Sequence, residues 1–239
     1  MQLWLCPIFA FLLGSIPFGL LIARAKGIDI RAHGSGNIGA TNVLRIVGKK
    51  FGIACFLLDM LKGLLPVVIA VNLIQIEGKK VGLFHIGTLD EFALMLPAAK
   101  QFTGQLVHVL TALAAVLGHN YSPWVGFKGG KGIATSAGVL FGLMPPIAIL
   151  LLVVIWILIF ITTRYVSIAS IGASVALPLL TLWGSWHHGR IQDGTWNKPL
   201  FFFTVVIAML ATWKHRSNIQ RLRDGTEHRF SRKSKSDHV

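Results

Sequence analysis

Glycine recurs beside hydroxyl, amide and basic side chains in residues 33–42, which read HGSGNIGATN and are followed by Arg45. Small residues let backbone N–H groups approach an anion, and a nearby cation adds to the attraction. The G-x-G-x-x-G spacing matches a dinucleotide fingerprint only formally, because an apolar run of helical length precedes it rather than a strand. The segment predicts an anion-binding loop, although a Gly-rich turn that only packs is the alternative. The candidates are Ser35, Gly36, Asn37, Gly39, Thr41, Asn42 and Arg45.

A second basic, Gly-rich segment covers residues 119–132 and reads HNYSPWVGFKGGKG. It is not a Walker A sequence, because Gly132 stands where that motif has its Mg-binding Ser or Thr. It nevertheless has the phosphate-binding features of a Walker A loop, since a glycine nest, two lysines and the start of a predicted helix all favour a phosphate. Lys131 lies within the nest and is expected to contact phosphate, whereas Lys128 can reach lipid headgroups. The candidates are Lys128, Gly129, Gly130, Lys131 and Gly132.

The third such segment, residues 214–222, reads KHRSNIQRL and is followed by Gly-Thr-Glu ending at Glu227. A basic tail after a last span is usually a topology anchor, which accounts for Arg221 and the arginines after it. It does not account for His215, Asn218 and Glu227. With an unperturbed pKa of about 6.5, His215 can act as a general base or hydrogen-bond a developing charge, and a structural histidine is the alternative.

These segments must be positioned by apolar elements. Hydrophobic residues make up 54% of the chain and charged residues 13%, against roughly 25% charged in soluble domains. The composition predicts an all-α integral membrane protein with seven transmembrane helices. The third and fourth apolar runs are richer in Gly and Ala and shorter than the roughly 20 residues of a span. The seven runs are residues 3–23, 51–75, 105–118, 132–143, 146–163, 166–186 and 199–213.

The charge is strongly asymmetric, with 23 Lys and Arg against 9 Asp and Glu. This excess suits anionic lipid or an anionic substrate. Nucleic acid is not expected as a partner, because the basic residues are not on a soluble domain. Alternate loops hold seventeen Lys and Arg on one side and five on the other. The positive-inside rule therefore predicts an N-terminus outside and a C-terminus in the cytoplasm.

No internal repeat or separate soluble domain is visible, and residues 1–230 are expected to form a single transmembrane domain. Residues 77–104 are interpreted as an extracytoplasmic insertion, in which residues 91–100 form a short interfacial helix or are disordered. Residues 231–239 are expected to be a flexible basic cytoplasmic tail. In the second apolar run, Asp59 and Lys62 lie on one face of the predicted helix. They are interpreted either as an ion pair that fixes helix packing or as residues that support the active site from behind.

Together, the three segments resemble the bacterial acyl-phosphate:glycerol-3-phosphate acyltransferases, the PlsY family. The resemblance rests on GSGNIGATN with Arg45, on GFKGGKGIAT and on HRSNIQRL with GTE, in the family's order. It covers the chain except residues 77–104. It implies a multi-pass enzyme of the bacterial cytoplasmic (inner) membrane, with its active site facing the cytoplasm. The implied reaction moves a fatty acyl group from acyl phosphate to the sn-1 hydroxyl of glycerol 3-phosphate, giving lysophosphatidic acid and phosphate, the first step of phospholipid synthesis.

The resemblance also implies roles for single residues. Ser35, Arg45, His215 and Asn218 take catalytic positions, and Ser167 falls where the family places a site serine. Glycerol 3-phosphate, acyl phosphate and anionic membrane lipids are the expected partners, with no obligate protein partner, no cofactor and no metal. The expected substrate-binding residues are Gly36, Asn37, Gly39, Thr41, Asn42, Lys128, Gly129, Gly130, Lys131, Gly132, Ser167 and Glu227.

The chemistry of the residues agrees with this assignment. Acyl phosphate is already activated, so positioning and electrostatic stabilisation can provide most of the rate. The hydroxyl proton goes either to a substrate phosphate oxygen or to a protein base. An anion transporter is one alternative, but it predicts repeats and a midplane site that the sequence does not show. A thioester-dependent acyltransferase is another. Its H-x-x-x-x-D signature occurs at His85 and at His188, both in predicted outer loops, and we interpret both matches as coincidence.

Overall fold

The structure, a computed structural model, describes residues 2–230 and is mainly helical, with two short strands. The predicted flexible tail, residues 231–239, lies outside the described residues. Each of the seven apolar runs is helical, as expected where backbone groups must find hydrogen-bond partners within their own segment. The helices are α1 Gln2–Gly14, α2 Phe18–Arg24, α3 Ala40–Ile46, α4 Lys49–Leu73, α5 Gln101–Asn120, α6 Ile133–Leu143, α7 Pro146–Thr163, α8 Val166–His187, α9 Lys198–Lys214 and α10 Arg216–Arg223.

Five helical stretches of the described chain are long and apolar enough to cross a membrane. One of them contains α5, whose 20 residues show that the prediction of a short third helix was wrong, because polar residues at both ends continue the helix. The fourth predicted helix is short as expected, since α6 has 11 residues. Outward-facing side chains such as Leu158 and Leu179, which are 58% and 65% exposed, form the kind of apolar surface that lipid covers.

The first apolar run forms one candidate span, Leu3–Arg24, as predicted, but its helix is interrupted between α1 and α2. Pro17 has no N–H to donate to the Leu13 carbonyl and interrupts the helix. The Ser15 and Ile16 carbonyls therefore have no helical N–H donor four residues further on. Two side chains from elsewhere replace those partners. Ser122 Oγ donates to the Ser15 carbonyl at 2.6 Å, and Lys62 Nζ donates to the Ile16 carbonyl at 2.6 Å. The break is thereby tied both to α4 and to the second Gly-rich segment.

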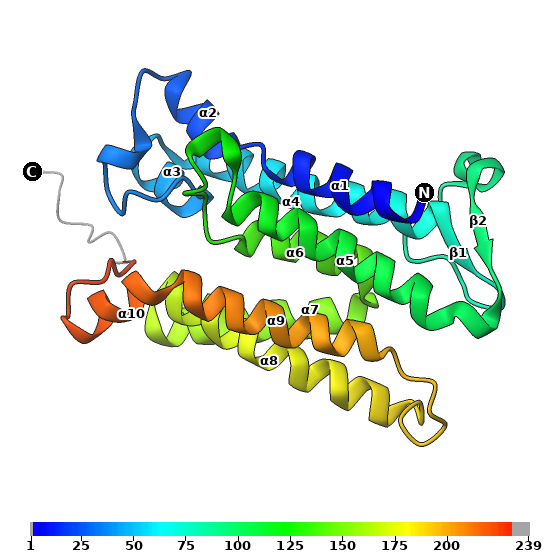
Figure 1. Cartoon of the computed structure of the whole chain (residues 1–239). Coiled ribbons are helices and arrows are strands. Elements are labelled where there is room, and N and C mark those ends of the chain that lie inside the picture. Colours follow the sequence, from blue (N-terminus) through cyan, green and yellow to red (C-terminus); the bar gives the residue numbers. More distant parts are fainter. Residues whose placement is uncertain (1, 231–239) are drawn as a thin grey trace, which may run out of the picture.

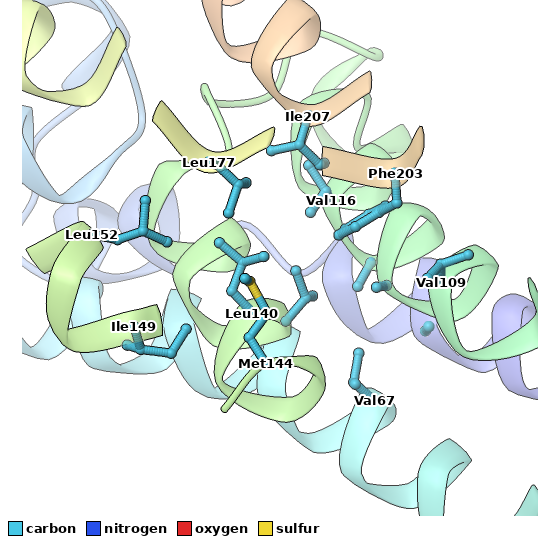
Figure 2. Packing of buried hydrophobic residues seen from close by; sticks show 14 residues of the cluster. Val67, Val109, Val116, Leu140, Met144, Ile149, Leu152, Leu177, Phe203 and Ile207 are labelled. Atoms are coloured by element: carbon cyan, nitrogen blue, oxygen red, sulfur yellow. The ribbon is translucent and has the colours of Figure 1, made fainter. Parts of the chain in front are cut away.

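The membrane helices form two groups, α1, α4, α5 and α6 in one and α7, α8 and α9 in the other (Figure 1). The groups meet at a buried apolar core to which Leu140, Leu152, Leu177 and Phe203 contribute from α6, α7, α8 and α9 (Figure 2). The short helices α2 and α3 beside one group, and α10 beside the other, lie at the same end of the molecule (Figure 1). That end holds the Gly-rich and basic segments.

The opposite end carries two short parallel strands, β1 Ile74–Ile76 and β2 Leu94–Leu96 (Figure 1). Ile74 pairs with Leu94, and the buried Leu96 packs against Val107 of α5. This pairing explains why residues 91–100 follow neither of the two alternatives given for them, a short interfacial helix and a disordered segment. The segment instead comprises the end of a 3-10 turn at Gly87–Phe92, the strand β2 and a second turn at Ala98–Lys100.

Candidate active site

A cavity of about 740 Å³ lies between the two helix groups. Polar side chains from all three Gly-rich and basic segments line it, including Ser35, Asn37, Arg45, Lys131, His215, Asn218 and Glu227. The remainder of its wall is largely apolar and comes from the membrane helices, including Phe141, Leu152, Val153, Trp156, Ile157 and Leu177. The cavity is therefore amphipathic, with a polar part beside α3 and α10 and an apolar part between α6, α7 and α8.

Glu227 accepts hydrogen bonds from side chains of distant parts of the chain. Its Oε1 accepts from Ser167 Oγ of α8 at 2.8 Å and from Asn218 Nδ2 of α10 at 2.6 Å. Its Oε2 accepts from Arg221 Nε at 2.8 Å, because the chain turns back after α10. Burial acts to raise the pKa of Glu227, but the bonds from these three side chains outweigh it and hold that pKa below its usual value. Glu227 is therefore an ionised carboxylate that organises this wall.

Lys131 Nζ donates a hydrogen bond to Asn218 Oδ1, so Asn218 connects this lysine to Glu227. Burial lowers the pKa of Lys131 to about 8, and Glu227 acts in the opposite direction. The positive charges of Arg221 and Arg45 lower that pKa further. Burial likewise lowers the pKa of Arg45, which remains charged at neutral pH. These cations outnumber the carboxylate, and the polar part of the cavity therefore attracts a phosphate.

His215 is 3% exposed and lines the cavity at the end of α9. Its Nδ1 lies 2.8 Å from the Ala211 carbonyl, which can only accept, so Nδ1 carries the hydrogen and Nε2 remains an acceptor. Burial and the charge of Lys131 lower the pKa of His215 to about 4. A histidine with this pKa is neutral at pH 7 and is a weak base, which favours the hydrogen-bonding role over general-base catalysis.

The first Gly-rich loop folds around Asn42, which is buried. Asn42 Nδ2 donates to the carbonyls of His33 at 3.0 Å and Asn37 at 2.9 Å. Its Oδ1 accepts from the Ser35 N–H at 3.1 Å. These bonds occupy the amide of Asn42, so that residue shapes the loop, while Ser35, Asn37 and Arg45 line the cavity.

The second Gly-rich segment connects α5 to α6, and Gly132 is the residue before α6 begins. Gly132 has a φ of 79°, and a Cβ there would lie 2.6 Å from Asn120 Oδ1, so the position requires glycine. Ile133 and Ala134, the first residues of α6, line the cavity beside Lys131. The positive end of α6 therefore opens onto the cavity next to a lysine, an arrangement that favours an anion.

A smaller cavity, of about 340 Å³, shares Asn37 and Lys131 with the larger one. Its other walls come from the second and third segments and from Trp213 of α9. They combine basic and aromatic side chains with glycine: Tyr121, Phe127, Lys128, Gly129, Gly130, Trp213, Lys214, Arg216 and Ser217. Its size and cationic walls suit a small, water-soluble phosphate ester. The shared residues place such a molecule directly beside the polar part of the larger cavity.

The structure brings most of the residues predicted from sequence to these two cavities. Ser35, Asn37, Gly39, Thr41, Arg45, Lys131, Gly132, Ser167, His215, Asn218 and Glu227 line the larger one. Lys128, Gly129 and Gly130 line the smaller one, and Lys128 is exposed. Gly36 and Asn42 line neither.

Among the titratable residues that line the larger cavity, sequence reasoning missed His119, Arg221 and His228, whereas Asp59 had been offered as support behind the active site. Arg221 was attributed to membrane topology, yet its place three residues after Asn218 put both on one face of a helix, and that spacing was the available signal. His119 belonged to the second segment but carried no expectation of its own. Within residues 2–230, no group of three or more His, Cys, Asp or Glu side chains lies close enough to hold a metal ion.

Neither H-x-x-x-x-D match lines the two cavities. His85 Nε2 does lie 3.0 Å from Asp90 Oδ2, but this exposed pair belongs to the segment that carries β1 and β2, at the opposite end of the molecule (Figure 1). The second match, His188, follows α8 at the same distant end. The interpretation of both as coincidence agrees with these positions.

Known proteins match nearly the whole chain. The family model described as glycerol-3-phosphate acyltransferase matches residues 4–225. Glycerol-3-phosphate acyltransferase of Aquifex aeolicus is 43% identical over 93% of this chain and 96% of its own, and that of Geobacter sulfurreducens is 45% identical over 92% and 94%. A crystal structure of PlsY (YgiH), an integral membrane glycerol 3-phosphate acyltransferase in its glycerol 3-phosphate form, is similar with a TM-score of 0.77, at 39% identity over 97% of this chain and 96% of that one. The chain therefore belongs to the PlsY family of glycerol-3-phosphate acyltransferases.

Proposed function

We propose that this protein transfers a fatty acyl group from acyl phosphate to the sn-1 hydroxyl of glycerol 3-phosphate, the first step of phospholipid synthesis. The observation that carries the proposal is the amphipathic cavity, whose polar part presents Lys131, Arg45 and the start of α6 while its remainder is apolar. Both substrates carry a phosphate and one carries an alkyl chain. The solved PlsY structures in glycerol 3-phosphate and lysophosphatidic acid forms support the same pairing.

The two cavities divide the substrates by their chemistry. Glycerol 3-phosphate is small and water-soluble, and it occupies the smaller cavity between Lys128, Lys131 and the glycines of the second segment. Acyl phosphate places its phosphate beside Arg45 and its chain among the apolar side chains of α6, α7 and α8. Lys131 and Asn37 line both cavities, so the two reacting groups meet there.

The reaction forms one ester bond and breaks one acyl–phosphate bond. The sn-1 hydroxyl oxygen attacks the acyl carbonyl carbon, and phosphate leaves with the electron pair of the broken bond. Arg45 and Lys131 stabilise the negative charge that develops on the leaving phosphate. Because the pKa of His215 is about 4, the hydroxyl proton goes to a phosphate oxygen, while His215 Nε2 accepts a hydrogen bond that orients the hydroxyl.

The site is proposed to face the cytoplasm of a bacterial cell, with seven membrane spans, the N-terminus outside and the C-terminus inside. The excess of Lys and Arg in the segments beside the cavity supports this orientation. Exposed aromatic side chains at the same end, Trp124 at 67% and Trp213 at 61%, suit the headgroup level of a membrane. Anionic lipids are then the neighbours of the basic surface, and residues 77–104 form an extracytoplasmic insertion.

A donor exchange tests this function. Purified protein in detergent receives glycerol 3-phosphate with palmitoyl phosphate, palmitoyl coenzyme A or a palmitoyl carrier protein in turn. Phosphate and lysophosphatidic acid should appear with palmitoyl phosphate and not with the thioesters. Equal rates with a thioester would show that the donor is not specific. Absence of product with every donor, combined with exchange of labelled glycerol 3-phosphate across vesicles, would favour the transporter alternative.

A further inference from the structure

Three charged or titratable side chains form a buried cluster behind the second Gly-rich segment. Asp59 and Lys62 of α4 are each 2% exposed, and His119 of α5 is 6% exposed. Lys62 Nζ lies 2.7 Å from Asp59 Oδ1, and His119 Nδ1 lies 3.6 Å from the same oxygen. Asp59 and His119 also line the larger cavity. The structure therefore confirms the predicted ion pair between Asp59 and Lys62, and both His119 and the buried Cys55 thiol also face its carboxylate.

His119 supports the glycine loop with both its backbone and its ring. The Gly130 N–H donates to the His119 carbonyl at 3.2 Å. A Cβ on Gly129 would lie 2.0 Å from that carbonyl oxygen, and a Cβ on Gly130 would lie 2.2 Å from His119 Nε2. The backbone of the two glycines therefore packs against His119 too closely for any residue with a Cβ. Lys131 is the next residue in the chain.

The orientation of the His119 ring depends on Asp59. His119 Nδ1 is buried and has no hydrogen-bond partner among the residues that the structure describes, and the Asp59 carboxylate faces it. A hydrogen on Nδ1 directed at that carboxylate leaves Nε2 beneath Gly130. Lys62 holds the carboxylate and also donates to the Ile16 carbonyl at 2.6 Å. The cluster thus runs from the break between α1 and α2 to the loop.

We propose that His119, oriented by Asp59 and Lys62, is a positioning residue. It fixes the position of the Gly129 and Gly130 backbone so that the loop and Lys131 can bind the phosphate of glycerol 3-phosphate. This inference rests on the proposed function for the identity of the ligand. The competing explanation is that the cluster only fixes helix packing. Packing alone does not require charge, because apolar residues of similar volume often replace a buried ion pair without loss of stability.

The test compares His119→Gln with the double variant Asp59→Leu/Lys62→Met. The double variant removes both charges together, so no unpaired charge remains buried and the protein is expected to fold. His108→Gln is the matched control, because His108 lies on the same helix and bonds the Ile74 carbonyl at 2.8 Å, far from the loop. For each variant, calorimetry gives the dissociation constant for glycerol 3-phosphate, kinetics give KM and kcat, and thermal unfolding gives Tm.

Both test variants should raise the dissociation constant and the KM for glycerol 3-phosphate by roughly tenfold or more, with a smaller change in kcat, while His108→Gln leaves all three unchanged. In a Lys131→Ala background, His119→Gln should raise the dissociation constant much less than it does in the wild-type protein, because the histidine acts through the loop that carries this lysine. A double variant with the wild-type Tm and the wild-type dissociation constant would overturn the proposal and leave packing as the role of the cluster.

The failure of the proposed function would look different from the failure of this inference. If the wild-type protein binds glycerol 3-phosphate but forms no lysophosphatidic acid from any donor, the function is wrong, yet the calorimetric comparison still tests the role of His119. If the wild-type protein catalyses the reaction and His119→Gln binds glycerol 3-phosphate as tightly as wild type, only the inference fails.

Discussion

Lys131 and Asn218 are joined by a hydrogen bond although 87 positions separate them in the chain. The bond connects the loop before α6 to α10, and Asn218 continues it to Glu227. A lysine ammonium has three N–H donors, so Lys131 can keep this bond and still bind a phosphate oxygen. The C-terminal segment therefore fixes the lysine before the substrate arrives.

Replacing Lys131 with Ala should weaken binding of glycerol 3-phosphate more than it slows turnover. A hydrogen bond to a charged group contributes about 1.5–3 kcal/mol, so KM should rise by roughly 10- to 150-fold. Lys100→Ala, at an exposed position next to the distant end of α5, is the control and should leave KM unchanged. An unchanged KM in Lys131→Ala would show that this loop holds something other than glycerol 3-phosphate.

The pKa of Lys131 predicts a specific pH dependence. Phosphate binding favours the protonated lysine, and the free protein has a Lys131 pKa of about 8. The kcat/KM for glycerol 3-phosphate should therefore be about half its plateau value at pH 8 and should fall further above it, approaching tenfold per pH unit. Lys131→Arg keeps its charge throughout this range and should lose the fall. The same fall in Lys131→Arg would assign it to another group.

His215→Gln separates hydrogen bonding from general-base catalysis. With a pKa of about 4, His215 is neutral across the working range, and glutamine can accept a similar hydrogen bond without acting as a base. The kcat of His215→Gln should stay within about tenfold of wild type, whereas loss of a general base costs about 10²–10⁴-fold. A loss in that larger range for Gln, matching His215→Ala, would restore His215 as the proton acceptor.

Acyl-chain length should depend on the apolar part of the larger cavity. Ala173 of α8 lines it, whereas Val175 on the same helix is 50% exposed on the outer surface. Ala173→Phe fills part of the cavity and should lower kcat/KM for long acyl phosphates by roughly 5- to 150-fold, the range expected when an apolar site is overpacked by 1–3 kcal/mol. Short acyl phosphates should be affected less. Val175→Phe should change neither, and an equal loss in both variants would place the acyl chain elsewhere.

Much of the fold could be predicted because apolar runs of helical length leave few alternatives in lipid. The errors arise where residues far away in the sequence decide the local structure. The run at residues 3–23 looks continuous, but Pro17 breaks it, and the break persists because Ser122 and Lys62 bond the freed carbonyls. That compensation involves residues 46 and 107 positions away, and no local pattern shows it. The pairing of β1 with β2 depends on distant segments in the same way.

The site residues likewise divide into those that local sequence could predict and those that depend on distant contacts. Ser35, Lys131 and His215 could be predicted from local residue types, because glycine, lysine and amide groups gather around them. The network around Glu227 could not, since it requires the chain to turn after α10 and meet α8. The opposite error concerned Asn42, whose residue type suited substrate binding but whose amide is occupied by the loop itself.

The proposed reaction is a direct acyl transfer between two phosphate-bearing substrates. The most direct measurement follows both products at once, with purified protein, palmitoyl phosphate and glycerol 3-phosphate, and locates the acyl group on the lysophosphatidic acid formed. Direct transfer should give equal amounts of inorganic phosphate and 1-acyl lysophosphatidic acid, with neither formed when glycerol 3-phosphate is omitted. Phosphate release without glycerol 3-phosphate, or an acyl group on the sn-2 hydroxyl, would contradict it.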